Sequence, residues 1–158
     1  MSSVYYLGSS IIERCDCGEN NLGKGGLRSS DLMKYYKDIR VNIKGNIVVM
    51  YIGSNDIRVH VNEKTVYNNV VEYIESIVHD VKKIIYIAIL KSPFISVKQE
   101  KAINYVNDHM RKYASVNTKV EYMNVNRELK SEKYYLKDNV HLNPDGNAML
   151  KKKIMSML

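Results

Sequence analysis

Three side chains of this sequence have the chemistry needed for acyl transfer. Ser10 follows an apolar run, residues 4–7, and a glycine, which predicts a hydroxyl exposed where a strand turns into a helix. Its backbone N–H then lies at a helix N-terminus, where developing negative charge is favoured. Asp138 and His141 stand three residues apart before the last helical pattern, a spacing that lets a carboxylate orient an imidazole and stabilise its charged form. Each residue also has an ordinary alternative, because such a serine is often only a helix cap and such a histidine is often structural.

Two other segments supply donors for an oxyanion. Residues 21–28 contain three glycines, including Gly26, that permit close approach of the backbone to a ligand. The spacing does not match a phosphate-binding loop, and the alternative is a flexible loop. Asn55 lies in the run 51–56 at the end of the central strand, and its amide can donate to an oxyanion. Alternatively, Asn55 could form an Asx-turn that caps the strand end, and Asp56 could cap the next segment in the same way.

The elements that must position these residues are read from the apolar pattern. Residues 4–7, 47–52 and 84–90 are continuous runs rich in Val, Ile and Tyr, which is typical of parallel strands covered on both faces. A weaker strand is predicted at 119–123. Between the runs, apolar residues recur at helical spacing, and the alternation predicts a doubly wound parallel α/β sheet. In such sheets ligands bind beyond the carboxyl ends of the strands, which is where the candidate residues fall.

Four helices are predicted between and after these strands. Val66 to Val81 and Ile103 to Tyr113 have the helical period, and Ser96 with Gln99 forms a capping-box pattern before the second of these. A short helix is expected at 29–36. The last helix is expected to open at Asn143-Pro144, which suit the cap and the first helical position.

The composition sets limits on the class of protein. The 158 residues suit one domain spanning 1–158, with a core that needs no disulfides. The net charge of +7 suggests a nucleic-acid partner only weakly, because the lysines are scattered and no recognition motif or basic stripe interleaved with aromatics is present. We therefore expect no nucleic-acid partner, although a salt-dependent affinity for DNA or RNA would revive that alternative.

The sequence also limits the cellular compartment and the cofactors to be expected. No run approaches the ~18 apolar residues of a membrane helix, and no signal-peptide pattern opens the chain, so a cytoplasmic protein without stable membrane insertion is expected. Cys15 and Cys17 are separated by one residue and are expected not to bridge each other, which favours a reducing compartment. They have no companion cluster of metal ligands, so neither a metal nor an organic cofactor is expected.

Taken together, the four segments resemble the sequence blocks of the SGNH hydrolases, also called GDSL esterases and lipases. The blocks correspond to residues 8–10, the Gly25-Gly26 loop, residues 53–56 (Gly-Ser-Asn-Asp) and residues 138–141 (Asp-Asn-Val-His). The resemblance spans nearly the whole chain, and the last two blocks are the most specific. The glycine loop is similar to that of the intracellular platelet-activating-factor acetylhydrolases and their bacterial relatives. The resemblance implies a three-layer, flavodoxin-like fold and a carboxylic ester hydrolase.

The resemblance also implies a role for each residue. Ser10 is the nucleophile, His141 the general base and then acid, and Asp138 the residue that orients the imidazole. The oxyanion hole comprises the backbone N–H groups of Ser10 and Gly26 and the side-chain amide of Asn55. The reaction passes through an acyl-serine intermediate.

Two departures from the family pattern qualify this interpretation. The family usually has Asp before the nucleophile, where it supports the loop by hydrogen bonding; this chain has Ser9, which can still accept and donate hydrogen bonds, so a weaker effect rather than an inactive enzyme is expected. The chain is also short and without a lid insertion, which predicts an open site for small acyl groups, such as acetyl, or exposed esters. Arg28 and Arg58 follow two of the motifs and would favour an anionic substrate if they lie near the site, but surface roles fit them equally well.

Other functions stay open at this stage. A catalytically weakened SGNH fold could serve as a binding or structural module, with Ser9 in its favour and the intact Ser10, Asn55, Asp138 and His141 against it. Within the hydrolases, the sequence does not choose among an esterase, a thioesterase, a lysophospholipase and a carbohydrate deacetylase. The oligomeric state is not determined.

Overall fold

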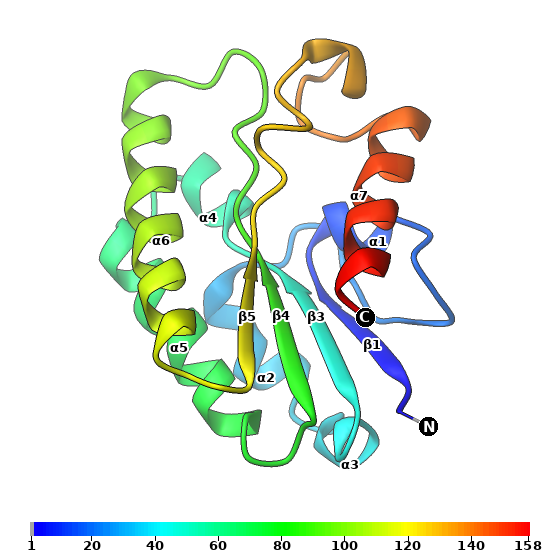
Figure 1. The fold of residues 1–158 in the computed structure, drawn as a ribbon. Coiled ribbons are helices and arrows are strands. Elements are labelled where there is room, and N and C mark those ends of the chain that lie inside the picture. Colours follow the sequence, from blue (N-terminus) through cyan, green and yellow to red (C-terminus); the bar gives the residue numbers. More distant parts are fainter. Residues whose placement is uncertain (1) are drawn as a thin grey trace.

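The computed structural model describes residues 2–158, which form a five-stranded parallel sheet flanked by helices (Figure 1). The strand order is β2-β1-β3-β4-β5, and every neighbouring pair is parallel. The strands are β1 (Val4–Gly8), β2 (Asn20–Asn21), β3 (Ile47–Tyr51), β4 (Lys83–Ile87) and β5 (Val120–Met123). The predicted doubly wound sheet is confirmed. The sequence pattern missed β2, because two asparagines carry no apolar signal.

Seven α-helices and two short 3₁₀ turns connect the strands within the described residues. The helices are α1 (Ser10–Glu13), α2 (Leu32–Tyr35), α3 (Arg40–Ile43), α4 (Ser54–Arg58), α5 (Glu63–Ile77), α6 (Val97–Ser115) and α7 (Pro144–Met157), and the 3₁₀ turns are Ser29–Asp31 and Glu132–Tyr134. The four predicted helices are present, the one at 29–36 as a 3₁₀ turn followed by α2. The sequence pattern did not predict α3 or α4, because four or five residues are too few to show a helical period, whereas α1 begins at Ser10, where a strand was predicted to turn into a helix.

The predicted helix starts are made by side-chain caps. The hydroxyl of Ser96 accepts from the Gln99 N–H at 3.0 Å, while the Gln99 side chain accepts from the Ser96 N–H at 3.0 Å. Asn143 accepts from the Gly146 N–H at 2.9 Å, with Pro144 in the first turn of α7. Such caps satisfy N–H groups that have no partner inside the helix.

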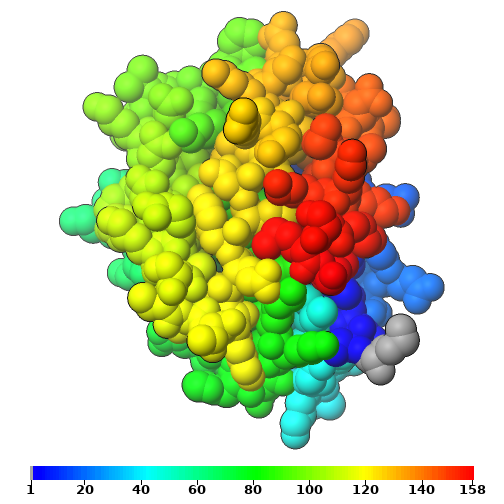
Figure 2. Space-filling model, viewed as in Figure 1, coloured from blue at the N-terminus to red at the C-terminus, as the bar shows by residue number. Residues whose placement is uncertain are grey.

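The sheet is buried between two helical layers because its side chains alternate between two apolar clusters. Val48 and Met50 of β3 face the cluster formed with α2, α5 and α6. Val49 and Tyr51 face the opposite cluster, which includes α1 and, from α7, Leu150 and Ile154. Figure 1 shows α5 and α6 on one side of the sheet and α1 and α7 on the other, and Figure 2 shows α7, in red, closing its side of the surface. The resulting three layers hold the strand ends rigidly.

The two cysteines differ from the sequence-based expectation. The structure joins Cys15 and Cys17 in a disulfide, with Cα atoms 5.2 Å apart and both residues buried. Asp16 between them has a φ of 56°, and this left-handed turn brings the two side chains to the same side of the chain. The prediction that they would not bridge is therefore wrong.

None of the helices within residues 2–158 is both long and apolar enough to cross a membrane.

Candidate active site

The turn that carries Ser10 is formed where β1 ends beside β3. Gly8 has a φ of +133°, and a Cβ at this position would overlap the carbonyl oxygen of Tyr51. The Ser9 N–H donates to that carbonyl at 3.1 Å, and the next residue, Ser10, begins α1. Glycine is required here by both the backbone conformation and the close approach of the two strands. The turn thus presents Ser10 at the carboxyl edge of the sheet.

A continuous chain of hydrogen bonds links Ser10, His141 and Asp138. The Ser10 Oγ lies 3.0 Å from the His141 Nε2, and the His141 Nδ1 lies 2.6 Å from the Asp138 Oδ2. A proton on Nδ1 donates to the carboxylate and leaves Nε2 free to accept from the hydroxyl. This arrangement suits proton transfer from the serine to the imidazole.

Asp138 is held by the backbone of its own turn. Its Oδ1 accepts from the N–H groups of Val140 at 2.9 Å and of His141 at 3.0 Å. The little burial it has raises the pKa of Asp138, but the hydrogen bonds from the His141 side chain and from these two N–H groups outweigh that effect and hold the pKa well below its usual range. The carboxylate of Asp138 therefore stays ionised and can accept a hydrogen bond from the His141 Nδ1.

The glycine loop runs directly alongside the serine turn. The Lys24 N–H donates to the Gly8 carbonyl at 2.7 Å, and the Gly25 N–H donates to the Glu13 carboxylate of α1 at 3.0 Å. A Cβ on Gly25 would lie 3.9 Å from the Ser10 Cβ. Gly26 follows with a φ of +82°. Within residues 2–158, no partner accepts from the backbone N–H of Ser10 or of Gly26, so both donors stay available.

Asn55 is tied to the same loop. Its Nδ2 donates to the Leu27 carbonyl at 3.0 Å, one residue beyond Gly26. A primary amide has two N–H donors, so one remains after this bond is made. Of the three predicted oxyanion donors, the Ser10 N–H belongs to the serine turn, and Gly26 and Asn55 belong to two segments that this bond joins, although Gly26 and Asn55 do not line the pocket described below.

The sequence allowed Asp56 to act as a cap, but in the structure it does not. It is buried and accepts from the Ser29 N–H at 2.9 Å and from the Ser29 hydroxyl at 2.7 Å. Asn69 of α5 donates to the Ser29 hydroxyl at 3.1 Å. Burial raises the pKa of Asp56, while the bonds from Ser29 act in the opposite direction. This network fastens the segment after the glycine loop to the segment that carries Asn55.

Ser9 supports the loop through its backbone rather than through its hydroxyl. The side chain is fully buried, and its Oγ has no hydrogen-bond partner within the described part of the chain. Its backbone does the supporting instead, since the carbonyl accepts from Ile12 and Glu13 at 3.0 Å each. The capacity of the Ser9 hydroxyl to form hydrogen bonds is therefore not used within residues 2–158.

Two tyrosines position the site without any signal in the sequence. The Tyr36 hydroxyl accepts from the Gly8 N–H at 2.9 Å and donates to the Leu22 carbonyl at 2.7 Å, which joins the serine turn to the glycine loop. The Tyr51 hydroxyl accepts from the Leu90 N–H at 3.1 Å. Burial raises the pKa of Tyr51, while the Leu90 N–H, Ser54 and the charge of Arg58 oppose that rise. In the sequence, a tyrosine within an apolar pattern looks like any other core residue. Only the hydrogen-bond partners of Tyr36 and Tyr51 in the structure show that these two position the site.

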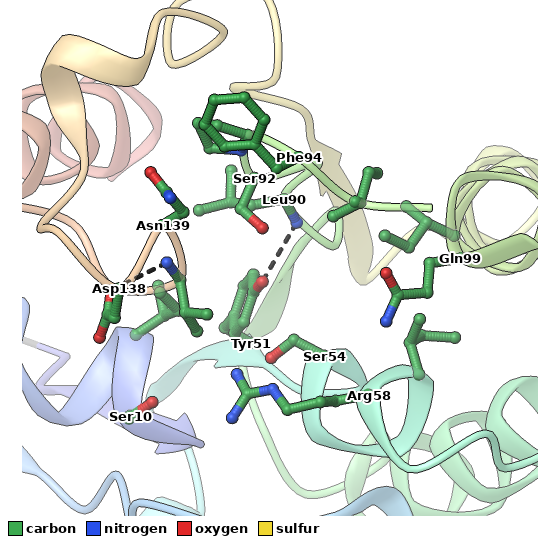
Figure 3. Close-up of a pocket in the computed structure, with 16 residues that line it drawn as sticks. Ser10, Tyr51, Ser54, Arg58, Leu90, Ser92, Phe94, Gln99, Asp138 and Asn139 are labelled. Atoms are coloured by element: carbon green, nitrogen blue, oxygen red, sulfur yellow. Dashed lines mark hydrogen bonds between the residues drawn. The ribbon is translucent and has the colours of Figure 1, made fainter. Parts of the chain in front are cut away.

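A pocket of about 320 Å³ opens beside Ser10 (Figure 3). Its floor includes Tyr51 and Leu90, and one wall is the loop 92–95, where Phe94 is exposed. Its polar lining comes from these side chains: Ser10, Ser54, Arg58, Ser92, Gln99, Asp138 and Asn139. Of the two arginines named from the sequence, Arg58 lines the pocket and Arg28 does not. The connections that line the pocket are residues 88–96, between β4 and α6, and residues 124–143, between β5 and α7.

A search of residues 2–158 for three or more His, Cys, Asp or Glu placed to hold a metal ion finds no such group.

The sequence matches one family of known proteins over most of its length. A family model described as the GDSL-like lipase/acylhydrolase family matches residues 4–149. No curated protein matches the chain.

Solved structures share the fold at low sequence identity. A member of the lipolytic G-D-S-L family from Veillonella parvula superposes with a TM-score of 0.84 at 17% identity, covering 97% of this chain and 96% of its own. A protein of Streptococcus pneumoniae described as a platelet activating factor gives 0.83 at 22% identity, covering 99% and 83%. An acetylxylan esterase from Geobacillus stearothermophilus, solved as a catalytic mutant, gives 0.80 at 15% identity, covering 99% and 94%. At these identities the comparison establishes the fold, which is the three-layer fold expected from the sequence.

Proposed function

The chain belongs to the GDSL-like lipase/acylhydrolase family and is a carboxylic ester hydrolase, and from this premise we propose that Ser10, His141 and Asp138 are its catalytic triad. The observation that carries the proposal is the hydrogen-bond chain from the Ser10 Oγ through both nitrogens of His141 to Asp138, with distances of 3.0 and 2.6 Å. A nucleophile, a base and an orienting acid in this order are the parts that acyl transfer requires.

The reaction proceeds in two halves. His141 Nε2 takes the proton of Ser10 as the Oγ attacks the ester carbonyl carbon, and the imidazolium then protonates the alkoxide as it leaves. Water, deprotonated by the same imidazole, attacks the acyl-serine and releases the carboxylic acid and free Ser10. Asp138 stays ionised throughout and stabilises the imidazolium, in keeping with its lowered pKa.

The oxyanion of each tetrahedral intermediate is held by three donors. These are the backbone N–H groups of Ser10 and Gly26 and the second N–H of the Asn55 amide. Two observations support this assignment. Both backbone N–H groups lack an acceptor within the described residues, and the Asn55 amide uses one of its two N–H donors on the Leu27 carbonyl, which leaves the other available. Donors in such positions typically contribute about 100- to 1000-fold each to the rate.

The proposed substrate is an ester of a small acyl group such as acetate. The pocket of about 320 Å³ is at the small end of the usual range for ligand sites, so the acyl and alcohol parts of an ester share a limited volume, which favours a short acyl group. One structural relative is an acetylxylan esterase, which agrees with an acetyl ester as the substrate class.

The test compares wild type with Ser10→Ala on p-nitrophenyl acetate and on a fluorophosphonate probe. Wild type is expected to hydrolyse the ester and to be labelled at Ser10, as located by peptide mass spectrometry, whereas Ser10→Ala loses both. Ser30→Ala, at an exposed serine outside the pocket, is the matched control and keeps both. A wild-type protein that neither hydrolyses the ester nor reacts with the probe would contradict the proposal and favour a binding module.

A further inference from the structure

Arg58 is the one cation among the residues that line the pocket beside Ser10. It is the last residue of α4, and Figure 3 shows its guanidinium extending into the pocket between the labelled Ser10 and Ser54. A guanidinium in this position meets whatever part of the substrate fills the pocket.

No carboxylate of the protein neutralises this charge. The ion pairs found within residues 2–158 do not include Arg58, and none of its side-chain nitrogens donates to another described residue. Asp138 is the one acid that lines the pocket, and its oxygens already accept from Val140 and His141. Asp56, two residues before Arg58, is buried against Ser29. The five donors of the guanidinium are therefore left to solvent or to a ligand.

The rest of the pocket offers one further donor to an anion. Its other polar side chains, apart from Asp138, are neutral, and Gln99 uses its oxygen on the Ser96 N–H, which leaves its amide N–H₂ as a donor. An adjoining hollow shares Ile57 and Gln99 with the pocket, but its lysines, Lys98 and Lys101, lie among the acids Glu63 and Glu100. The positive charge that distinguishes the pocket is therefore that of Arg58 itself.

We propose that Arg58 binds an oxyanion group, a carboxylate or a phosphate, carried by the alcohol part of the ester substrate. The inference rests on the proposed function, because with an acetyl-sized acyl group on Ser10 the pocket is left for the alcohol. The planar guanidinium suits such groups because it donates two parallel hydrogen bonds to two oxygens. Arg58 is thus a specificity residue that separates anionic esters from neutral ones of the same size.

The experiment measures kcat/KM, from released acetate, on matched acetyl esters. The carboxylate arm compares 3-acetoxypropanoate with its methyl ester, and the phosphate arm compares 2-acetoxyethyl phosphate with 2-acetoxyethanol. Wild type is expected to prefer at least one anionic ester by about tenfold, mainly through KM, and the preference is expected to shrink as salt rises. The arm with the larger preference identifies the anion.

Three variants separate Arg58 from the general charge of the protein. Arg58→Met is expected to lower kcat/KM on the anionic ester far more than on its neutral partner, so that the preference is lost. Arg111→Met, at an exposed arginine of α6 that does not line the pocket, removes the same charge and is expected to keep the preference. Arg58→Glu is expected to reverse it, with acetylcholine hydrolysed faster than its neutral isostere 3,3-dimethylbutyl acetate.

The outcomes against the inference are distinct from those against the proposed function. Equal hydrolysis of anionic and neutral esters by wild type, or a preference that survives in Arg58→Met, overturns the role of Arg58 and leaves the Ser10 chemistry standing. Absence of hydrolysis of every ester together with absence of fluorophosphonate labelling overturns the proposed function and this inference with it.

Discussion

The side-chain amide of Asn55 donates to the carbonyl of Leu27 across 3.0 Å and so fastens the turn after β3 to the glycine loop. The two residues are 28 positions apart in the sequence. The same bond fixes the direction of the second amide N–H, which is the donor that we assign to the oxyanion. One side chain thus both holds the loop that carries Gly26 and supplies a donor of its own.

This relationship predicts that Asn55→Ala acts on the chemical step. The variant is expected to lower kcat on p-nitrophenyl acetate by about 100-fold with little change in KM, because an oxyanion donor acts in the transition state. Asn55→Asp is expected to be worse, since a carboxylate at this position repels the oxyanion. The matched control is Asn42→Ala, at an exposed asparagine of α3, which is expected to leave kcat unchanged. A loss confined to KM would remove Asn55 from the oxyanion hole.

The lowered pKa of Asp138 predicts the shape of the pH profile. A carboxyl group whose pKa lies below its unfolded value of about 3.9 stays charged above that pH and loses its contribution only as the pH falls through the folded value. Protonation of Asp138 is therefore expected to cause no fall in kcat/KM above about pH 5. The measurement is the pH dependence of acetate ester hydrolysis, and a slope steeper than one on the acidic side of this range would mean that Asp138 titrates there.

A substitution of Asp138 tests its role in the triad. Asp138→Asn keeps the size of the side chain but not its charge, and it is expected to reduce kcat by roughly 1000-fold or more. Asp145→Asn, an exposed aspartate in the first turn of α7, is the control and is expected to be nearly silent.

The buried Asp56–Ser29 pair predicts an effect on stability. Asp56→Ala leaves the N–H and the hydroxyl of Ser29 without an acceptor in a buried place, and the free energy of unfolding is expected to fall by about 2–4 kcal/mol. Asp56→Asn is expected to cost about 1 kcal/mol, because it keeps one acceptor and removes a charge that burial disfavours, as the raised pKa indicates. Urea unfolding at pH 7 measures both values against Asp108→Ala, at an exposed aspartate of α6. If Asp56→Ala proves no less stable than this control, the network does not hold the loop.

Much of the fold could be predicted because it follows from local patterns. The continuous apolar runs of β1, β3 and β4 reflect burial on two faces, and the caps at Ser96 and Asn143 act within three residues. The Asp138–His141 pair belongs to the same class, since both bonds between them are closed inside one turn. Patterns of this kind are present in the sequence itself because the partners are neighbours along the chain.

What the sequence alone did not determine depends on contacts between distant segments. Ser10 and His141 are 131 residues apart, and their 3.0 Å contact exists only because β1 lies inside the sheet, between β2 and β3, beside the layer that holds α7. The isolated hydroxyl of Ser9, the disulfide between Cys15 and Cys17, and the presence of Arg58 but not Arg28 in the pocket were likewise decided by packing. Residue type and spacing by themselves determined which side chains are able to react, and the tertiary structure decided which of them meet, because the direction of a side chain is set by neighbours from other parts of the chain.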